Sequence, residues 1–489
     1  MRIFQILPWL LALVLTKVTA QPAALPPPSP FEGVWIGRIV APNTSTTLGL
    51  AFTRTEKGLL VSLYFPEMFL YGVNFGPAEI HGDTFSLAPL SLSLTLSGDN
   101  LAGTFAIAKL PVELHRGGTF DPAPPTPSFP RAPSPAWSRS LGAAAWASPV
   151  ARDGVLYFGT VDGKFHAIKA SDGDELWSWP GPNPFYGAAL ADEKNIFVVD
   201  EQCALVCLDR VTGALAWRSS LYNAKLAGGP PPKNETFNHR ATAPVLDEKK
   251  GLLYVGSTDG GLYAVRARNG KILWRQPMPA RIYAPVTLHD ADVFVACFDG
   301  TLLGLDRRTR REILRAKPGG ALVASPVVAG DRIVIGARDY MLYGLDTRSG
   351  ATTWRDSYWF SWVESTPRLA DGVLYVGASD FRRVSAIDPA AGRTLWATDV
   401  GGLSWGTPLV TADKVFAGTA GQNIEGTVIH HAGGIMALDR NTGAVKWHYR
   451  SPIAPKSDFV GFAGSLVEAD GKIIGAAVDG TLIAFPIAP

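Results

Sequence analysis

Cysteine is scarce in this sequence, with three residues in 489, and their spacing argues against both disulfides and metal binding. Cys203 and Cys207 fall in one expected strand, where four residues span roughly 13 Å, which is too far for a disulfide. Cys297 lies much further along the chain. No CxxC or HxxxH spacing occurs, so a zinc site is not expected. We therefore expect three buried free thiols.

Net charge and helical patterning are also nearly absent. The 45 basic and 43 acidic residues leave a net charge of +2, and no long basic run is present. We therefore expect neither nucleic acid nor an anionic membrane as a partner. Residues 136–489 show no helical periodicity, and turn-rich β structure fits the 51 glycines and 38 prolines of the chain.

One apolar segment at the start of the chain has the pattern of a signal peptide. Arg2 precedes the apolar run 3–15, which is short for a membrane span, and the small residues 18–20 offer a cleavage site. No cysteine follows this run, so a lipid anchor is not expected. Residues 1–20 therefore predict an exported soluble protein, periplasmic or secreted, which we expect to be a monomer.

Tryptophan recurs at a nearly constant spacing. The steps between successive positions are 40, 40, 57, 40, 40, 42 and 51 residues, and a leucine fills the one gap in the series. A repeat of about 40 residues built from short strands is typical of β-propellers, whose units must pack around a ring to bury their apolar faces. The positions are Trp137, Trp177, Trp217, Trp274, Leu314, Trp354, Trp396 and Trp447.

Each repeat predicts four strands. In the first copy, residues 147–179, Asp-Gly turns separate short apolar runs, and a Gly turn leads into the strand with Trp177. Eight copies follow this pattern, and the eighth contains only three strands. Residues 136–142 are a fourth strand with no repeat before it. We therefore expect this segment to pair with the last repeat and close the ring.

Two proline-rich linkers, residues 21–30 and 121–135, bound a smaller domain. Residues 31–120 read as short alternating strands, which predicts a small antiparallel β-barrel or sandwich. This domain resembles the lipocalin-like accessory domains of secreted bacterial hydrolases, which open with the same G-x-W-x-G strand, here around Trp35. The predicted fold class is therefore all-β, with an eight-bladed propeller over residues 136–489 after an accessory packing or binding module.

The propeller region resembles the eight-bladed pyrroloquinoline-quinone-type (PQQ-like) repeat proteins. The tryptophan-docking motif of that family is matched by CLDRVTGALAW, GLDTRSGATTW, AIDPAAGRTLW and ALDRNTGAVKW. The resemblance implies the fold. It leaves the function open, because the family includes quinoprotein dehydrogenases, the scaffold of outer-membrane-protein assembly and sensor domains.

Most of the repeated residues have a structural interpretation. We expect each tryptophan to stack between adjacent blades. The aspartate of the L-D-x-x-x-G turns, such as Asp439, is expected to accept hydrogen bonds from nearby backbone N–H groups rather than to act in catalysis. His430 and His431 are adjacent on a loop tip, which favours solvated side chains over a pair of metal ligands.

The longest loops are expected on one face of the ring. Strand order places the insertions 222–239 and 420–433 there, together with the aromatic loop 358–362. The position before each innermost strand is aromatic in four consecutive blades, which predicts a ligand pocket at the channel mouth. The alternative is packing between blades. The candidate binding residues are Trp146, Tyr186, Arg240, Arg281, Trp359, Trp362, Glu364, Trp405 and Phe462.

Two functions follow from these residues. We expect a non-catalytic scaffold that binds a protein, peptide or small ligand through exposed aromatics and needs no cofactor. The alternative is a dehydrogenase that uses PQQ and calcium, for which Glu364 is a candidate metal ligand. The sequence has no Cys-Cys pair, which related dehydrogenases often use as a platform for the quinone, and no CxxCH haem motif.

Overall fold

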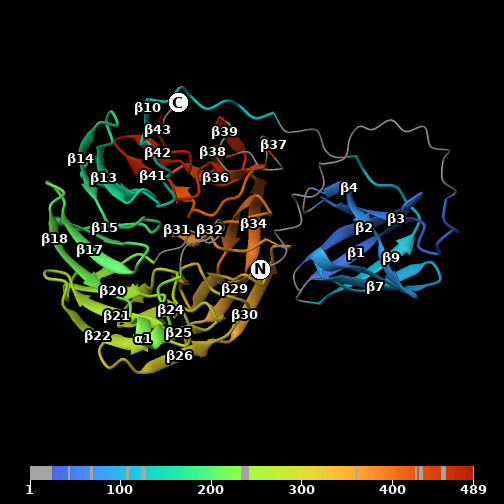
Figure 1. Cartoon of the computed structure of the whole chain (residues 1–489), viewed down its shortest axis with the longest axis horizontal. Helices are drawn as coiled ribbons and strands as arrows, with labels where there is room; N and C mark the ends of the chain where they lie inside the picture. Colours follow the sequence, from blue (N-terminus) through green and yellow to red (C-terminus); the bar gives the residue numbers. More distant parts are fainter. Residues whose placement is uncertain are drawn as a thin grey trace. The chain divides into compact units, whose positions relative to one another are not determined.

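The computed structural model describes residues 25–41, 44–66, 70–105, 109–122, 128–232, 242–359, 361–424, 427–428, 433–452 and 459–487. The chain divides into two compact units, Met1–Pro127 and Ser128–Pro489 (Figure 1). The predicted signal peptide lies outside the described residues. Among the helices of the described part, none has the length and apolar character needed to cross a bilayer.

The first unit is one antiparallel sheet of nine strands in the order β4-β3-β2-β1-β9-β8-β7-β6-β5. Phe52 of β2 contacts Phe85 of β6 at 4.9 Å between ring centroids, although four strands separate β2 from β6 in the sheet. The sheet therefore curls into a nearly closed barrel with aromatic rings inside. Its elements are β1 (Gly33–Ala41), β2 (Thr44–Thr55), β3 (Gly58–Phe65), β4 (Leu70–Pro77), β5 (Glu79–His81), β6 (Thr84–Leu87), the 3-10 helix η4 (Ala88–Leu90), β7 (Leu92–Ser97), β8 (Asn100–Phe105) and β9 (Leu110–Arg116).

Trp35 of the G-x-W-x-G strand is fully buried. Its Nε1 donates to the Phe31 carbonyl at 2.8 Å, and the Arg116 guanidinium lies 4.1 Å from the ring centroid. Arg116 also donates to the Glu32 carbonyl, so the first and last strands are tied together. The predicted all-β front domain is confirmed, with a barrel rather than a sandwich.

The second unit is an eight-bladed propeller of four-stranded antiparallel sheets, as predicted. Blades one to four are β11 (Val150–Arg152), β12 (Val155–Gly159), β13 (Lys164–Lys169) and β14 (Glu175–Pro180); β15 (Leu190–Ala191), β16 (Asn195–Val199), β17 (Ala204–Asp209) and β18 (Leu215–Ser220); β19 (Val245–Asp247), β20 (Leu252–Gly256), β21 (Gly261–Arg266) and β22 (Ile272–Pro277); β23 (Thr287–His289), β24 (Asp292–Ala296), β25 (Leu302–Asp306) and β26 (Glu312–Ala316).

Blades five to seven continue around the ring in the same order. They are β27 (Val327–Ala329), β28 (Arg332–Gly336), β29 (Met341–Asp346) and β30 (Thr352–Ser357); β31 (Arg368–Ala370), β32 (Val373–Gly377), β33 (Arg383–Asp388) and β34 (Arg393–Asp399); β35 (Leu409–Val410), β36 (Lys414–Ile424), β38 (Gly434–Asp439) and β39 (Val445–Arg450). The seventh sheet gains two short strands, β37 (Thr427–Val428) and β40 (Phe459–Gly461), which pair with the long β36.

The eighth blade closes the ring as predicted. Strand β10 (Trp137–Ser140) pairs antiparallel with β43 (Thr481–Pro486), the last strand of the chain, and Trp137 lies opposite Ala484. The rest of the blade is β42 (Lys472–Ala476) and β41 (Val467–Ala469). One sheet thus combines both ends of the propeller sequence.

The repeated tryptophans pack between blades, as expected. The Trp177 Nε1 donates to the Arg210 carbonyl in the turn of the next blade at 3.2 Å. Gly213 of that turn has a φ of 72°, and a Cβ added there would lie 2.5 Å from the Trp177 ring. Glycine is therefore needed for both the backbone conformation and the contact. Trp137, Trp217, Trp354 and Trp396 make the same kind of hydrogen bond.

Each innermost strand is preceded by a lead-in segment that bridges two blades. In seven of these segments, one N–H donates to the preceding blade, as Phe185 does to the Thr160 carbonyl at 3.2 Å. The carbonyl one residue earlier accepts from the segment's own blade, as Pro184 does from Glu201. The bridging N–H groups belong to Ala145, Phe185, Ile282, Leu322, Val363, Ser404 and Phe462.

Candidate functional site

The bridging hydrogen bonds correct the register of two predicted site positions. Phe462 is equivalent to Phe185, not to Tyr186, because the segment before Ser465 is one residue shorter than the segment before Ala189. Phe462 is 1% exposed and packs in the core between blades seven and eight. The residues that directly follow the bridging positions are Trp146, Tyr186, Tyr283, Val323, Glu364, Trp405 and Ala463.

The first part of the candidate site is an aromatic cluster from blades one, seven and eight. The rings of Trp146 and Trp405 stack with centroids 6.3 Å apart, and Phe459 contacts both at 5.5 and 5.8 Å. The Trp405 Nε1 donates to Ser379 Oγ at 2.9 Å, which fixes the indole. Both tryptophans are half-buried, so each retains surface that a partner can cover.

A second cluster joins blades four, five and six around Arg338. Its Nε donates to Glu364 Oε1 at 2.7 Å, and the two side chains are 12% and 3% exposed. The guanidinium lies 4.4 Å from the Trp362 ring centroid and 5.5 Å from that of Phe298. Phe298 in turn contacts Tyr283 at 5.1 Å. Glu364 therefore forms a buried ion pair between aromatic rings, a geometry in which cation–π attraction adds to the charge pairing.

Sequence reasoning missed Arg338 and Phe298. Both occupy the position before the aspartate in the turn between the second and third strands, where other repeats have Val161 or Thr258. The signal was present as RDY and FDG in place of TDG. It required comparing the same turn position across all repeats.

The remaining predicted residues are spread over the same loops. Trp359 is 4% exposed, so most of its surface is already used in packing. Tyr186 is half-buried, and burial raises its pKa. Arg281 is exposed, and its carbonyl accepts from the Phe298 N–H at 2.9 Å. Arg240 lies outside the described residues. No binding role of these residues is tested by the geometry, and the role stays a prediction.

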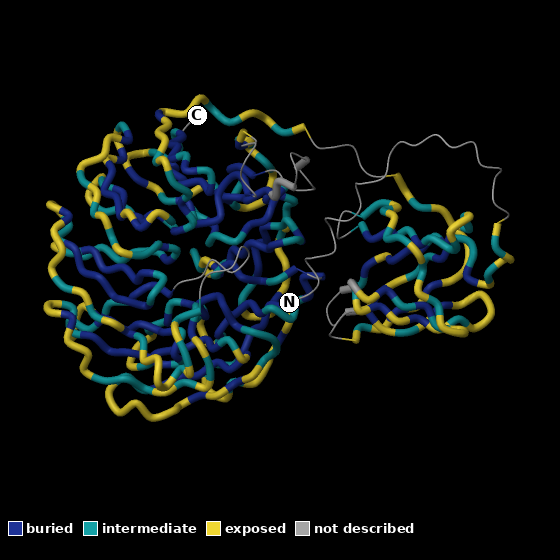
Figure 2. Tube along the Cα trace, in the orientation of Figure 1, coloured by how far each residue is buried: buried dark blue, intermediate teal, exposed yellow. Residues whose placement is uncertain are grey.

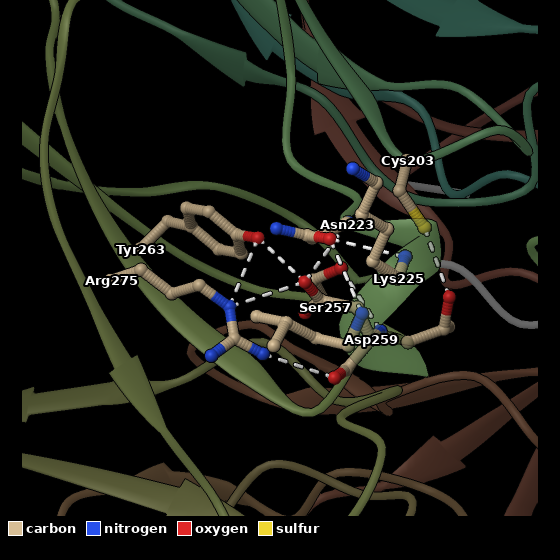
Figure 3. Close-up of polar contacts among 9 residues, drawn as sticks. Cys203, Asn223, Lys225, Ser257, Asp259, Tyr263 and Arg275 are labelled. Atoms are coloured by element: carbon tan, nitrogen blue, oxygen red, sulfur yellow. Dashed lines mark hydrogen bonds and ion pairs between the residues drawn. The ribbon is translucent and has the colours of Figure 1, made fainter. Parts of the chain in front are cut away.

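The start of the insertion 222–239 is anchored by a buried carboxylate (Figure 3). Asp259 Oδ2 accepts hydrogen bonds from the Asn223 N–H at 3.1 Å, the Tyr263 hydroxyl at 2.6 Å and Arg275 Nε at 3.2 Å. Burial, followed by the contact with Asp259, raises the pKa of Tyr263. Asn223 Oδ1 accepts from the second and third N–H groups after it and so caps the short helix α1 (Ala224–Ala227). The insertion therefore leaves the ring in a fixed direction.

The insertion 420–433 continues the backbone of blade seven. Strand β36 runs beyond β38 and pairs with β40 through Ala420, Gly421 and Gln422. Because β40 leads into blade eight, the insertion is tied to the same ring segment as Trp405. His430 and His431 lie outside the described residues, so the expectation of solvated histidines stays a prediction.

The donor groups that calcium and a quinone need do not converge in the described part of the chain. No three His, Cys, Asp or Glu side chains there are grouped as metal ligands. Cys203, Cys207 and Cys297 are buried free thiols, as predicted, and burial raises the pKa of Cys207 and Cys297 to about 12. Such thiols are inert near neutral pH and are not a platform for a cofactor.

Similarity to known proteins is concentrated in the propeller. The chain is 22% identical over 55% of its length to tetrathionate hydrolase of Acidithiobacillus ferrooxidans, and 27% identical over 48% to quinohemoprotein alcohol dehydrogenase of Comamonas testosteroni. It is 22% identical over 49% to outer membrane protein assembly factor BamB of Shewanella oneidensis. These matches span 59%, 36% and 60% of the relatives' own lengths.

Solved structures share the propeller fold. The computationally designed Ika8 protein matches 72% of this chain and 99% of its own with a TM-score of 0.57 and 18% identity, which speaks for the fold alone. The family described as outer membrane protein assembly factor BamB matches residues 131–283, 259–360 and 359–488. Together these segments cover the propeller from its first strand to its last, and the chain belongs to this family of PQQ-like repeat propellers.

Proposed function

We propose that this protein is an exported, non-catalytic scaffold that binds a protein or peptide partner through the long-loop face of its propeller. Membership of the family of outer membrane protein assembly factors supports a role in binding. Export rests on the apolar segment at residues 3–15. The predicted partner class follows from the residues at the lead-in segments.

The stacked pair of Trp146 and Trp405 carries the proposal. Half-buried tryptophans on a rigid framework are typical anchors of protein interfaces, because little conformational entropy is lost when a partner covers them. Phe459 and the hydrogen bond to Ser379 hold the rings in place before any partner arrives. The insertions beside them supply further contact surface.

The charged groups of the site favour binding over catalysis. A general base needs a carboxylate or imidazole that is available to a substrate proton. Glu364 is instead 3% exposed and paired with Arg338. Its role in this geometry is to orient Arg338 against Trp362. The PQQ and calcium alternative requires oxygen ligands that are not grouped in the described residues, and we derive no reaction step through it.

The test measures binding to a partner isolated from the envelope of the source organism. Trp405→Ala is expected to weaken binding by about 30-fold, the typical effect of removing an aromatic anchor. Arg348→Ala, an exposed side chain in a turn between third and fourth strands, serves as the control and is expected to bind like the wild type. Equal affinities for the Trp405 variant and the wild type would refute the proposal.

A second measurement decides between scaffold and dehydrogenase. The purified protein is incubated with PQQ and calcium, and quinone absorbance and dye-linked alcohol oxidation are followed. We expect neither stable quinone binding nor oxidation. Oxidation that is lost in Glu364→Gln would replace the scaffold by the enzyme.

A further inference from the structure

The turns between the third and fourth strands form a repeated set on the outer margin of the propeller. We call them rim turns. Six of them share one hydrogen bond, in which the first residue's N–H donates to the sixth residue's carbonyl, as Asp306 does to Arg311 at 3.0 Å. The six turns can therefore be compared position by position. They are residues 169–174, 209–214, 266–271, 306–311, 346–351 and 439–444.

Two neighbouring rim turns differ from the others in charge. Residues 266–271 of blade three contain two arginines and one lysine without an acid, a charge of +3. Residues 306–311 of blade four contain four arginines and one aspartate, again +3. The turns of blades two, five and seven each contain one Asp and one Arg, a charge of 0, and the turn of blade one has a charge of −1.

The arginines of the blade four turn are directed to solvent. Arg308, Arg310 and Arg311 are exposed, and within the described part of the chain no carboxylate oxygen forms an ion pair with them. The Arg310 guanidinium lies 5.9 Å from the Trp274 ring centroid, which connects the turn to blade three. Arg307 is excluded from this set because it pairs with Asp247 at 2.6 Å.

The acids nearest to these arginines are already engaged. Asp306 Oδ1 accepts from the Thr309 N–H and hydroxyl of its own turn, which lowers its pKa. Glu312 pairs with Arg315 at 2.6 Å. The positive charge of the turn is therefore not neutralised by its neighbours.

Aliphatic side chains are exposed between the two basic turns. Ile272 and Leu273 of β22 are each 38% exposed, and Ile313 of β26 is 45% exposed. Strands β22 and β26 are the outer strands of neighbouring blades, and the exposed outer margin of this region is visible in Figure 2. We define the basic rim patch as Ile272, Leu273, Arg308, Arg310, Arg311 and Ile313.

We propose that the basic rim patch binds an anionic lipid surface. Arginines beside exposed aliphatic side chains match the two layers of such a surface, with the guanidinium groups at the phosphates and the aliphatic groups at the boundary of the acyl chains. Turn tips and outer strands project outward, and a soft planar surface accommodates projecting side chains. Protein interfaces instead favour aromatic anchors in packed pockets, and the patch has aliphatic residues in those places.

The partner at the patch is distinct from the partner at the long-loop face. Rim turns and lead-in segments lie on different loops of each blade, and no residue is shared with the Trp146 and Trp405 cluster. The lipid proposal therefore stands or falls separately from the proposed scaffold function. It revises the sequence-based expectation that an anionic membrane is not a partner. The balanced total charge concealed two adjacent turns of +3.

The test is co-sedimentation of the full chain with vesicles made of equal parts phosphatidylglycerol and phosphatidylcholine. We expect binding to these vesicles, weakening with salt, and none to vesicles of phosphatidylcholine alone. The variant R308Q/R310Q/R311Q is expected to bind about 100-fold more weakly, since each arginine near an anionic surface contributes about fivefold. Arg348→Gln, from a turn without net charge, is the matched control and should bind like the wild type.

Three outcomes overturn the proposal. They are no sedimentation with the anionic vesicles, equal binding to both kinds of vesicle, and wild-type binding by the triple variant. An acidic protein as the true partner would show as binding to poly-glutamate without binding to vesicles. Because the three arginines are exposed, the variants should fold, and an unchanged melting temperature checks this. Ile313→Ser supplies an independent variant, for which we expect weaker binding at high salt.

Discussion

At the scale of single residues, the sequence predicted roles more reliably than positions. The tryptophans and the aspartates of the rim turns have the structural roles that their repetition indicated, and Asp439 Oδ1 accepts from the Asn441 and Thr442 N–H groups. Phe462 was misplaced by one residue, because the distance from the bridging N–H to the next turn varies among copies. Arg338 was missed because its effect depends on Trp362 and Glu364 from another loop. Such juxtapositions are set by the closed ring and leave no local pattern.

Gly213 permits a direct test of tryptophan docking. Gly213→Ala combines a strained positive φ with a clash against the Trp177 ring, and we expect a loss of about 3 kcal/mol in the free energy of unfolding. Gly154→Ala is the control, since Gly154 has a φ of 73° and an added Cβ would meet no atom within 4 Å. It should lose about 1 kcal/mol. Denaturant unfolding measures both, and equal losses would show that the ring contact contributes nothing.

Asp356 should make stability depend on pH. Burial raises its pKa to about 6, although Ser357 and Arg383 favour the charged form. The native state therefore holds a proton that the unfolded state releases near pH 4, and stability from this group falls as pH rises from about 4 to about 6. Asp356→Asn is expected to gain about 2 kcal/mol at pH 7, allowing for its partial exposure, and nothing below pH 4.

Asp439 provides the opposite sign. Hydrogen bonds from Lys446 and Thr442 lower its pKa to about 2, so its contribution is present above pH 4 and is lost as pH falls toward 2. Asp439→Asn should lower stability at pH 7 and have no effect near pH 2. Urea unfolding at both pH values compares the two variants. If both change stability in the same direction at pH 7, the assignment of these carboxylates is wrong.

At the scale of elements, strands and turns were predicted and loop paths were not. Asp-Gly turns and alternating apolar residues specify the blades, because each repeat buries the same faces. The insertion 222–239 has no such pattern. Its direction depends on Asp259, which was indistinguishable in sequence from the aspartates of the other T-D-G turns.

Removal of the Asp259 carboxylate should release this insertion. Asp259→Ala leaves Arg275 and Tyr263 without their acceptor, and breaking a buried charge pair costs about 3 kcal/mol. Limited proteolysis should then cut near Asn223 at lower protease concentration than in the wild type. Asp299→Ala is the matched control, since Asp299 occupies the equivalent turn of blade four and accepts only from Thr301. Identical cleavage of the two variants would contradict the anchoring role.

At the scale of the whole molecule, the fold was accessible from the sequence because the repeat counts its own blades. Three strands at the end and one at the start specify a closed ring, and β10 and β43 confirm it. The extent of the propeller was less evident. Residues from Ser128 belong to the propeller unit, and the Ala132 N–H donates to the His448 carbonyl of blade seven. Proline content alone does not separate a spacer from a segment held against a blade.

Three truncations should separate these contributions. Deletion of residues 1–127 should leave the melting temperature of the propeller unchanged. Deletion of residues 1–134 should lower it slightly, through loss of the contacts to His448. Deletion of residues 1–142 removes β10 and should lower it strongly, because β43 then becomes an open edge. Equal melting temperatures after the second and third deletions would refute closure by β10.

Closure by β10 also determines how the ring responds to force. Trp137, at the start of β10, lies opposite Ala484, near the end of β43, so both chain ends leave the pair from the same side. Tension between the ends therefore loads the hydrogen bonds one after another instead of all at once. The clasp opens like a zipper, beginning at Trp137, and it is the mechanically weakest seam of a ring whose other blades each consist of one continuous stretch of chain.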